Sequence, residues 1–595
     1  MQVLQALVWP DPSVHPSPAL SFKLGAGISL DPDAHQIRFE PEALLRLDTA
    51  YNIFSWLKWR GACHISKLAL RLHGSGKFVL QVVAEQPSLR SVLTRDVTLT
   101  EGQPHLIDLT DWVAGRDDSV LHVTLCAVTA GQIMAVDWIT PEPPRRKPRL
   151  LVCVTTFRRA EAATATALRL DAFLQRHALA EQMHLLIVDN DRSLTLPPLS
   201  HVTLVGNPNL GGSGGFARGL AEACARGDTH CLFMDDDAWV DMDSIVRTWT
   251  FLANVTDPSV AIAGALTRGD DPTIVWENSA FFSGHCHHMF ADMNLLDADD
   301  LTAVEFASLL PQRPNIYGAF WFFAFPVAAV RHWPFPFFIR GDDVNFSIVN
   351  PFRIMTLPGV VSYQEHDFSD KDTSLTQYLG LRCDLLQVLL LPHMPKRFLW
   401  AVKVPCVFFV RMIILLRMDS LHALNLALED ILSGPAYFAA NPDAATRRAE
   451  LSTERRREIW QPFDGTLPEQ RRHLDPNVVW QRLLLKFSLS GLFLPVFGLW
   501  GNHIVLPRNH RKLVRQCWGA AQITYVSHDG KEAMTLRQDK RAAFREGVRM
   551  TRNIARLAFG YRSLRRRWLA GFPHLTSAAF WQSQFRDPQG PDSPV

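Results

Sequence analysis

The chain has 595 residues, of which 47% are hydrophobic and 20% charged, and its formal net charge is +2. This composition is that of a folded protein and excludes general disorder, and the length exceeds what one hydrophobic core covers, so we expect about three domains. The small net charge gives no argument for a nucleic-acid partner, and we expect none.

The cysteines and the first residues bear on the compartment. The nine cysteines are scattered and form no Cys-x-x-Cys pair, which is typical of a reducing environment. The first ten residues contain no basic segment, and their apolar run is too short for a signal peptide. We therefore expect a cytoplasmic protein.

The first 140 residues predict β-structure. Four segments rich in Val, Leu and Thr are separated by turn residues, namely Lys77–Glu85, Ser91–Glu101, Ser119–Thr129 and Gln132–Thr140. They favour a jelly-roll-like β-sandwich domain over residues 1–140. The aromatic segment Tyr51–Trp59 would stack on a sugar or fill the core, and core packing is the favoured interpretation. The Pro- and Arg-rich residues 141–149 predict a stiff linker.

Strands and helices then alternate, which predicts an α/β domain over residues 150–390 with a mostly parallel sheet. The expected elements are strand Leu150–Thr155, helix Glu161–His177, strand His184–Val188, strand Val202–Val205, helix Gly215–Ala225, strand Cys231–Met234 and helix Asp243–Asn254. Ligands of such folds bind at the carboxyl ends of the strands.

Three adjacent carboxylates, Asp235 to Asp237, follow the apolar strand Cys231–Met234. They repel one another unless a cation offsets their charge, and hard divalent ions prefer such oxygen ligands. The sequence therefore predicts a metal site at this edge, with a solvated Asp-rich turn as the alternative.

A glycine-rich segment, Asn207–Gly219, precedes these aspartates. Glycines let the backbone approach a ligand, and the helix that follows would point its amino terminus at a diphosphate. A dinucleotide-binding interpretation is disfavoured, because the glycines follow the third strand of the domain and three carboxylates exceed what a ribose hydroxyl needs.

Taken together, these motifs resemble a known family. Thr155-Thr-Phe-Arg-Arg159, Val188-Asp-Asn190, Asn209–Gly219 and Phe233-Met-Asp-Asp-Asp237 are similar to the nucleotide-sugar half of GT-A type glycosyltransferases. In particular they resemble the bacterial polymerising galactofuranosyltransferases of the inverting glycosyltransferase family 2. That family has an N-terminal β-sandwich, a central GT-A domain and a helical C-terminal region, so the resemblance covers nearly the whole chain in outline.

The resemblance implies a donor site and a metal site. The implied donor-binding residues are Thr155, Phe157, Arg159, Asp189, Asn190, Asn209, Gly211, Gly212, Asp235 and Asp236. The implied Mn²⁺ or Mg²⁺ ligands are Asp235, Asp237 and His366. Glu365 is the alternative third ligand, because the family's histidine position falls on it when counted back from Ser369.

The resemblance also implies an acceptor site. Asn315–Phe323 stands at the place of the family's aromatic acceptor wall, and the implied acceptor residues are Tyr317, Phe320, Trp321 and Trp276. Asp342 and Asp343 are the implied catalytic pair, with Asp343 as the base and a helix N-cap pair as the alternative. Gly341 stands where the relatives have Trp, and His285–His288 is interpreted as an ordinary loop near the acceptor side.

Residues 391–595 predict a helical and basic region. Between Arg511 and Arg567 the chain has 15 Lys or Arg residues against 4 Asp or Glu residues. Its apolar segments Val404–Leu416 and Phe487–Pro507 are too short or too interrupted to span a bilayer. We expect a peripheral association with an anionic membrane at the inner face of the plasma membrane, with a solvated, core-packed pair of helices as the alternative.

The activity implied by the resemblance is the metal-dependent, inverting transfer of galactofuranose from UDP-galactofuranose to a growing cell-surface glycan. The acceptor would be a lipid-linked or oligosaccharide glycan, and the relatives suggest a homo-oligomer. Two alternatives stay open. One is transfer of another sugar, such as a rhamnosyl or glucosyl unit, on the same fold, and the other is a catalytically silent carbohydrate-binding assembly protein.

Overall fold

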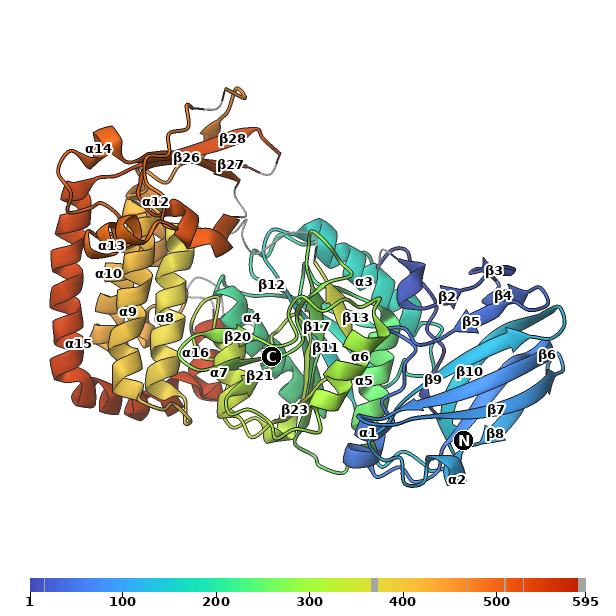
Figure 1. Cartoon of the computed structure of the whole chain (residues 1–595). Coiled ribbons are helices and arrows are strands. Elements are labelled where there is room, and N and C mark those ends of the chain that lie inside the picture. Colours follow the sequence, from blue (N-terminus) through green and yellow to red (C-terminus); the bar gives the residue numbers. More distant parts are fainter. Residues whose placement is uncertain (15–16, 365–372, 467, 508–509, 528, 587–595) are drawn as a thin grey trace.

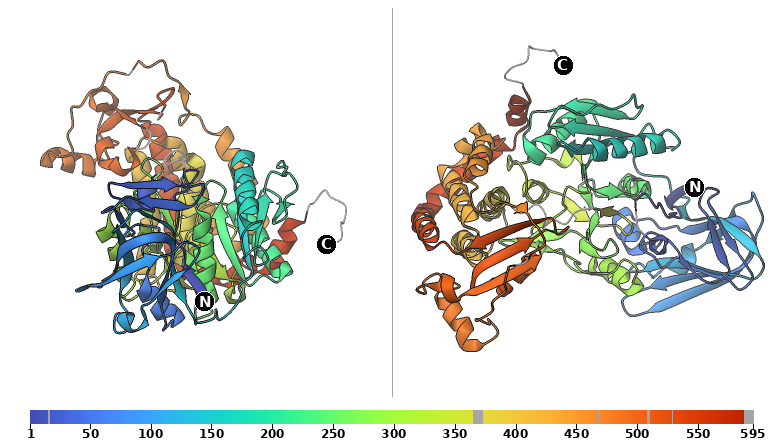
Figure 2. Two further views of the ribbon diagram at one scale, coloured as in Figure 1. Left: turned by 90° about the vertical axis from the view of Figure 1, so that its right-hand side faces the viewer. Right: turned by 90° about the horizontal axis from the view of Figure 1, so that it is seen from above.

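The computed structural model describes residues 1–14, 17–364, 373–466, 468–507, 510–527 and 529–586. The chain forms three bodies in a row (Figure 1). A β-rich N-terminal body and a C-terminal helical body lie at opposite ends of a central α/β body, as the view from above also shows (Figure 2). The protein is therefore a multidomain α/β protein.

The N-terminal body consists of ten antiparallel strands organised around the long strand β6 (Ala69–Glu85). The first half of β6 pairs with β10 (Gly131–Thr140), and its second half pairs with β9 (Val120–Ala127) and β7 (Arg90–Leu99). Gly74 lies at the change of partners, where a Cβ would stand 2.1 Å from the carbonyl oxygen of Gln132. The four strands expected in this region are thus confirmed.

The remaining elements of this body are short. They are β1 (Gln2–Gln5), β2 (Lys23–Leu24), β3 (Ile28–Asp31), β4 (Gln36–Phe39), β5 (Leu44–Arg46), β8 (His105–Asp108), α1 (Trp56–Lys58) and α2 (Thr110–Val113). The two short helices mean that the body is not made of strands alone. The aromatic segment 51–59 is buried, so core packing is the correct interpretation and no sugar platform forms there.

Buried polar contacts hold the N-terminal body on the central body. The Tyr51 hydroxyl lies 3.0 Å from that of Tyr363, and Lys58 Nζ lies 2.8 Å from Glu305 Oε1. The linker is also packed, because Arg146 donates from its backbone and from its guanidinium to the carbonyls of Ala253 and Val255. It fixes the two bodies rather than acting as a free spacer.

The central body contains a seven-stranded sheet in the order β13-β12-β11-β14-β22-β16-β23. Its strands are β11 (Leu150–Thr156), β12 (Met183–Asp189), β13 (Val202–Gly206), β14 (His230–Asp235), β16 (Val260–Ala263), β22 (Phe323–Pro326) and β23 (Arg353–Met355). The first four are mutually parallel, and β22 is antiparallel to both of its neighbours. Their carboxyl ends therefore share one edge, as the sequence predicted.

Three helices follow these strands: α3 (Ala160–Leu174), α4 (Gly211–Arg226) and α5 (Met242–Asn254). The alternation expected from the sequence is confirmed. Two boundaries differ by three or more residues, because α3 ends at Leu174 rather than His177 and α4 begins at Gly211 rather than Gly215. Glycine has a poor helix propensity, which is why the sequence alone assigned these residues to a loop.

The rest of the central body consists of short elements on the acceptor side. They are β15 (Trp239–Val240), β17 (Ala265–Thr267), β18 (Val275–Glu277), β19 (Ala280–Phe282), β20 (Cys286–His288), α6 (Ala298–Ala307), β21 (Ile316–Tyr317), α7 (Asp342–Val349) and β24 (Val361–Tyr363). Within the segment 285–288, interpreted from the sequence as a loop, Cys286–His288 form β20 and pair with β19.

The helical body is built from α8 (Ser374–Leu390), α9 (Arg397–Ile414), α10 (Met418–Ser433), α11 (Pro435–Ala440), α12 (Ala445–Thr453), α13 (Val479–Phe487), α14 (Phe497–Trp500) and α15 (Lys540–Leu575). The last helix, α16 (Ala578–Phe585), returns to the central body, where Trp581 Nε1 donates to the carbonyl of Pro334 at 2.8 Å. No helix among the described residues is long and apolar enough to cross a bilayer.

The expectation of a purely helical C-terminal region is wrong. A four-stranded sheet contains β25 (Gln461–Pro462), β26 (Asn502–Pro507), β27 (Ala520–Val526) and β28 (Glu532–Arg537). β26 and β27 are rich in Ile, Val, Thr and Tyr, residues that favour strands. A short apolar run does not distinguish a strand from a helix. The basic residues nearby favoured the interpretation as a helix at a membrane surface.

Candidate donor and acceptor sites

The three aspartates lie at the carboxyl edge of the central sheet. Asp235 ends β14, and Asp236 is buried, where the Thr156 hydroxyl donates to it at 2.8 Å. The Nη1 atom of Arg159 lies 2.8 Å from Asp236 and 2.7 Å from Asp237. Burial raises the pKa of Asp236 and the Arg159 charge opposes that rise. One guanidinium thus offsets part of the negative charge at this edge.

The same edge carries carboxylate oxygens, the ligand type that a hard divalent cation prefers. Asp235 and Asp237 offer carboxylate oxygens, and Gln364 reaches the site through a hydrogen bond from Nε2 to Asp237 at 3.3 Å. The carboxylates therefore fit such an ion. His366 and Glu365, the two candidates for the third ligand, lie outside the described residues.

Among the described residues, one group brings three ligand atoms together, namely His422, Glu450 and Glu454. Guanidinium groups already border it, because Arg549 contacts His422 Nδ1 at 3.1 Å and Arg447 donates to Glu450. These guanidinium groups already offset the negative charge of the group.

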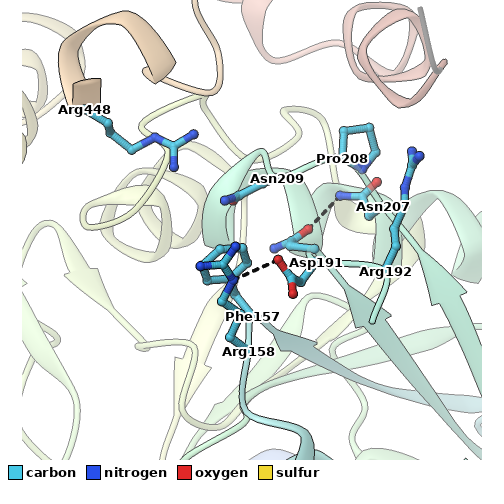
Figure 3. Close-up of a pocket in the computed structure, with 9 residues that line it drawn as sticks. Phe157, Arg158, Asp191, Arg192, Asn207, Pro208, Asn209 and Arg448 are labelled. Carbon is cyan, nitrogen blue, oxygen red and sulfur yellow. Dashed lines mark hydrogen bonds and ion pairs between the residues drawn. The ribbon is translucent and has the colours of Figure 1, made fainter. Parts of the chain in front are cut away.

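A cavity of about 570 Å³ opens at the loops that follow β11, β12 and β13 (Figure 3). Its lining residues are Phe157, Arg158, Asn190, Asp191, Arg192, Asn207, Pro208, Asn209 and Arg448. Arg158 lies over the ring of Phe157 and pairs with Asp191 at 3.0 Å. The cavity combines an aromatic ring, amides and guanidinium groups, a combination that suits a nucleotide.

Three of the implied donor residues line this cavity: Phe157, Asn190 and Asn209. Asn190 Nδ2 donates to the carbonyl of Gly211 at 3.1 Å, and its Oδ1 accepts from Asn207 Nδ2 at 2.9 Å. Asp189 instead accepts from the backbone N–H groups of residues 191 and 194, so it shapes the loop below the cavity. Its carboxylate acts on the loop and not on the cavity directly.

The start of α4 is packed too tightly for side chains. Gly211 has φ +68°, and a Cβ there would lie 2.1 Å from the carbonyl oxygen of Phe338. That carbonyl accepts from the backbone N–H of Ser213 at 3.1 Å. Thr155 packs under the same turn, where a Cβ on Gly215 would lie 2.2 Å from its Cγ2. The glycines therefore serve close packing between the donor segment and the chain that leads to Asp342.

The implied catalytic pair lies in the first turn of α7. Gly341 is the N-cap residue, with φ +86°, so neither aspartate caps the helix and that alternative is wrong. A Cβ on Gly341 would lie 2.3 Å from Cys383 Sγ, which leaves no room for a larger side chain at this position. Gln387 of α8 donates to the Gly341 carbonyl at 2.7 Å and accepts from Asn345, so the helical body supports the pair.

The two carboxyl groups of this pair differ in surroundings. Asp342 is buried and faces the glycine turn, where a Cβ on Gly212 would lie 3.5 Å from its Oδ2. Asp343 is half-buried and accepts from the N–H of Val344 at 2.8 Å. Burial and the charge of Asp342 raise the pKa of Asp343, with a further contribution from Glu277. A carboxyl group of this kind is suited to proton transfer near neutral pH.

The implied acceptor residues fall into two groups. Tyr317 is buried beside Cys286, and Trp276 meets the ring of His288 edge-on at 5.1 Å. Phe320 instead packs with its ring among Phe216 and Phe233, so it offers no free face to a sugar. Tyr317 is thus buried close enough to Asp343 to interact with its charge, Trp276 packs on His288, and Phe320 lies in the core.

Trp321 is half-buried, and its Nε1 atom donates to the carbonyl of Gly264 at 3.0 Å. This hydrogen bond fixes the plane of the indole ring at the start of β22. The indole ring also packs against buried hydrophobic residues of the core.

Several residues near these sites escaped the sequence analysis. Glu277 is buried and contacts His288 Nδ1, and it acts on the pKa of Asp343. Asp384 of α8 has a pKa raised to about 7 by burial. Glu277 ends β18, and no local sequence pattern links it to Asp343. Only the fold brings the two carboxyl groups close enough to interact.

The chain is similar in sequence to known galactofuranosyltransferases. The chain is 23% identical over 606 residues to the galactofuranosyltransferase GlfT2 of Mycolicibacterium smegmatis, covering 93% of this chain and 90% of that protein. It is 25% identical to the galactofuranosyltransferase GlfT2 of Mycobacterium tuberculosis, covering 68% of each. It is 27% identical to the galactofuranosyltransferase GlfT1 of the same species, covering 27% of this chain and 53% of that protein.

No protein-family model matches the chain. Among solved structures, mannosyl-3-phosphoglycerate synthase from Rubrobacter xylanophilus aligns at 12% identity and a TM-score of 0.23, covering 40% of this chain and 74% of that one, which is too weak to bear on the fold. The similarity over nearly the whole chain confirms the resemblance inferred from the motifs.

Proposed function

We propose that this glycosyltransferase, a relative of the galactofuranosyltransferases, transfers a galactofuranosyl unit from UDP-galactofuranose to a growing glycan with inversion. One observation carries the proposal. Thr155, the strand partner of Asp235, packs against Gly215 of α4, and Asp342 faces Gly212 in the first turn of the same helix. A donor held at the aspartate edge would present its sugar to the pair Asp342 and Asp343.

The donor would be held by the cavity and the aspartate edge. Phe157 offers a ring face to the uracil base, and the amides of Asn190 and Asn209 offer hydrogen bonds to the nucleoside. Arg159 is the cation already placed between Asp236 and Asp237. Asp235 and Asp237 would hold Mn²⁺ or Mg²⁺, which when bound stabilises negative charge on the diphosphate.

The chemical step follows from the position of Asp343. Its carboxylate accepts the proton of the acceptor hydroxyl, whose oxygen then forms the new bond to the anomeric carbon. The bond from that carbon to the diphosphate oxygen breaks, and UDP leaves with the electron pair. Attack from the face opposite the leaving group inverts the anomeric centre. Asp342 keeps the pKa of Asp343 high enough for this task.

The proposed acceptor side consists of Trp276 and Trp321, with Glu277, His288 and the buried Tyr317 behind them. Aromatic faces suit sugar rings, and a buried carboxylate paired with histidine suits hydroxyl groups. A lipid-linked or oligosaccharide glycan fits this side. Phe320 is not part of the proposed surface, because its ring is in the core.

We also propose a peripheral membrane position at the inner face of the plasma membrane. On α15, Phe544, Val548 and Phe559 are exposed among the basic residues of that helix, as are Trp480 and Phe487 on α13. Exposed aromatic rings beside Lys and Arg favour the headgroup region of an anionic membrane. Leu557 of the same helix does not contribute to this apolar surface, because it is fully buried in the helical core.

The membrane position predicts binding to vesicles containing phosphatidylserine at low salt, and release as the salt concentration rises. Replacing Phe544 and Phe559 with Ser should weaken this binding without changing activity on a soluble acceptor. Equal partitioning onto neutral and anionic vesicles in a flotation assay would contradict the electrostatic part.

A donor screen tests the transferase function directly. Purified protein is incubated with UDP-galactofuranose, UDP-galactopyranose, UDP-glucose or dTDP-rhamnose and an oligogalactofuranoside acceptor, and products are measured by mass spectrometry. We expect chain extension with UDP-galactofuranose alone. Extension with a different donor would reassign the sugar, and binding of glycan without turnover of any donor would contradict the enzyme.

A further inference from the structure

One wall of the donor cavity comes from a different body of the protein. Eight of the nine lining residues belong to the strand-end loops of the central body, and the ninth is Arg448 of α12 in the helical body. Figure 3 shows its side chain extending from α12 toward the cavity, across from the loops that carry Phe157 and Asn209. Nothing in the donor motifs pointed to this residue.

The helix that carries Arg448 is firmly anchored by its neighbour. Arg447 binds both oxygens of the buried Asp430 on α10, at 2.6 Å and 3.1 Å. Asp430 also accepts from the hydroxyl of Tyr378 on α8 at 2.6 Å. Two successive arginines thus point in different directions, one into the helical body and one out toward the cavity. The anchored helix holds the position of Arg448.

The side chain of Arg448 is also oriented on the cavity side. Its Nε donates to the carbonyl of Asp443 at 3.1 Å, and its guanidinium lies 4.6 Å from the ring centroid of Phe338. Phe338 is the residue whose carbonyl accepts from Ser213 in the first turn of α4. The guanidinium is therefore stacked beside the amino terminus of α4, a place that favours anions.

Arg448 differs from Arg158, another arginine of the cavity lining, in its charge partners. Arg158 is paired with Asp191 at 3.0 Å. Arg448 forms no ion pair within the part of the chain that the structure describes, and its Nη atoms have no hydrogen-bond acceptor there. It is half-buried, so its positive charge is held at the cavity wall with its outer donors available.

We propose that Arg448 is a donor-binding residue, whose guanidinium binds the diphosphate of the nucleotide sugar from the side of the helical body. The donor site then spans two bodies of the chain, and the diphosphate lies between Arg448 and the aspartate edge with its cation. A planar guanidinium with paired donors matches phosphate oxygens better than any other side chain. The inference rests on the proposed function, because it assumes a nucleoside diphosphate donor.

The test compares UDP with uridine. Arg448→Gln removes the charge and keeps most of the side chain, so we expect the Kd for UDP to rise about 10- to 100-fold, as for a lost hydrogen bond to a charged group. The Kd for uridine should not change, because uridine carries no phosphate. Both are measured by isothermal titration calorimetry of the full chain with Mn²⁺ present.

Two further variants sharpen the test. Arg448→Lys keeps the charge but loses the planar fork and the stacking on Phe338, so it should recover a part of the UDP affinity. Arg472→Gln makes the same charge change at an exposed arginine of the helical body that does not line the cavity, and it should bind UDP as the unchanged protein does. A thermal melt of each variant checks the fold.

Each outcome decides a different statement. Unchanged UDP affinity in Arg448→Gln, or an equal loss for UDP and uridine, would overturn the role of Arg448 and leave the transferase proposal intact. If the protein binds dTDP rather than UDP and loses that binding in Arg448→Gln, the inference stands and the UDP donor is overturned. If it binds no nucleoside diphosphate, both are overturned.

Discussion

The central body holds two clusters of carboxylates, and the clusters differ in their charge partners. At the donor edge, Asp236 and Asp237 share the guanidinium of Arg159. At the acceptor side, Asp342 and Asp343 form no ion pair within the described part of the chain, and Asp343 accepts from a backbone N–H. Arg159 opposes the rise that burial causes in the pKa of Asp236, whereas the repulsion of Asp342 adds to that rise in the pKa of Asp343.

This difference follows from the task of each group. A ligand for a cation must stay ionised at all working pH values, which a neighbouring positive charge favours. A base must release and accept a proton near the working pH, which requires a raised pKa. Burial and the repulsion between Asp342 and Asp343 supply that rise. The same residue type thus serves two chemistries because of its surroundings.

The largest effect should come from removing the cation of the donor edge. If Asp235 and Asp237 hold a divalent ion, excess chelator should reduce turnover to the background, and Mn²⁺ should restore it. Asp237→Ala should abolish the metal-dependent part of UDP binding, measured by calorimetry with and without Mn²⁺. Full turnover in excess chelator would remove the contrast between the two groups, because Arg159 would then be a sufficient cation.

The second effect concerns the base. Asp343→Asn removes the proton acceptor but keeps the shape, so kcat should fall by about two to four orders of magnitude. UDP affinity should stay unchanged, because the donor edge is separate. Since Gly341 is the N-cap, a capping defect cannot explain such a loss.

The matched variants for this test are Asp342→Asn and Glu365→Gln. Asp342→Asn should lose less activity than Asp343→Asn, because Asp342 is buried and faces the glycine turn. A near-normal kcat in Asp343→Asn together with a large loss of kcat in Glu365→Gln would assign the base to Glu365. The contrast between the two carboxylate clusters would then be wrong.

The sequence predicted the donor edge better than the acceptor side for a physical reason. Asp235 to Asp237 are adjacent in the chain and follow an apolar strand, so local sequence already places them at a sheet edge. The register of β11 and β14 confirms it, because Thr155 lies opposite Asp235. Residues that act together there are close in sequence or at equivalent strand ends.

The acceptor side depends on long-range packing instead. Glu277, Asp343 and Asp384 come from β18, α7 and α8, and no local pattern links them. Phe320 lies in an aromatic run that the resemblance placed on a sugar-binding wall, but it stands in the turn between β21 and β22, and its ring packs in the core against Phe216 and Phe233. Arg448 was missed for the same reason, because a different body carries it to the cavity.

A smaller effect tests the glycine turn that joins the two groups. Gly211→Ala forces a side chain into φ +68° with a Cβ 2.1 Å from the Phe338 carbonyl oxygen. We expect it to lower the free energy of unfolding by about 1–3 kcal/mol, seen as a drop in Tm. Gly212→Ala is the matched control, because its Cβ meets its nearest atom at an ordinary 3.5 Å. Equal Tm values would show that the turn carries no packing constraint.

The smallest expected effect is a shift in the pH profile of kcat/KM, which tests the contrast between the two carboxylate clusters directly. Asp343 acts as a base only when ionised, so kcat/KM should fall as the pH drops through its raised pKa. The charge of Asp342 is one cause of the rise, after burial. Asp342→Asn removes that charge, lowers the pKa of Asp343, and should move the acidic limb of the profile to lower pH by about one unit.

Two further variants rank the causes. Glu277 also raises the pKa of Asp343 but less strongly than Asp342, so Glu277→Gln should move the limb in the same direction by a smaller amount. Asp384 is not among the charges that act on Asp343, so Asp384→Asn should leave the limb in place. A limb that stays at the same pH in all three variants would mean that the pH dependence arises elsewhere. It would then belong to the donor edge, and the two carboxylate groups would not divide the work as their surroundings suggest.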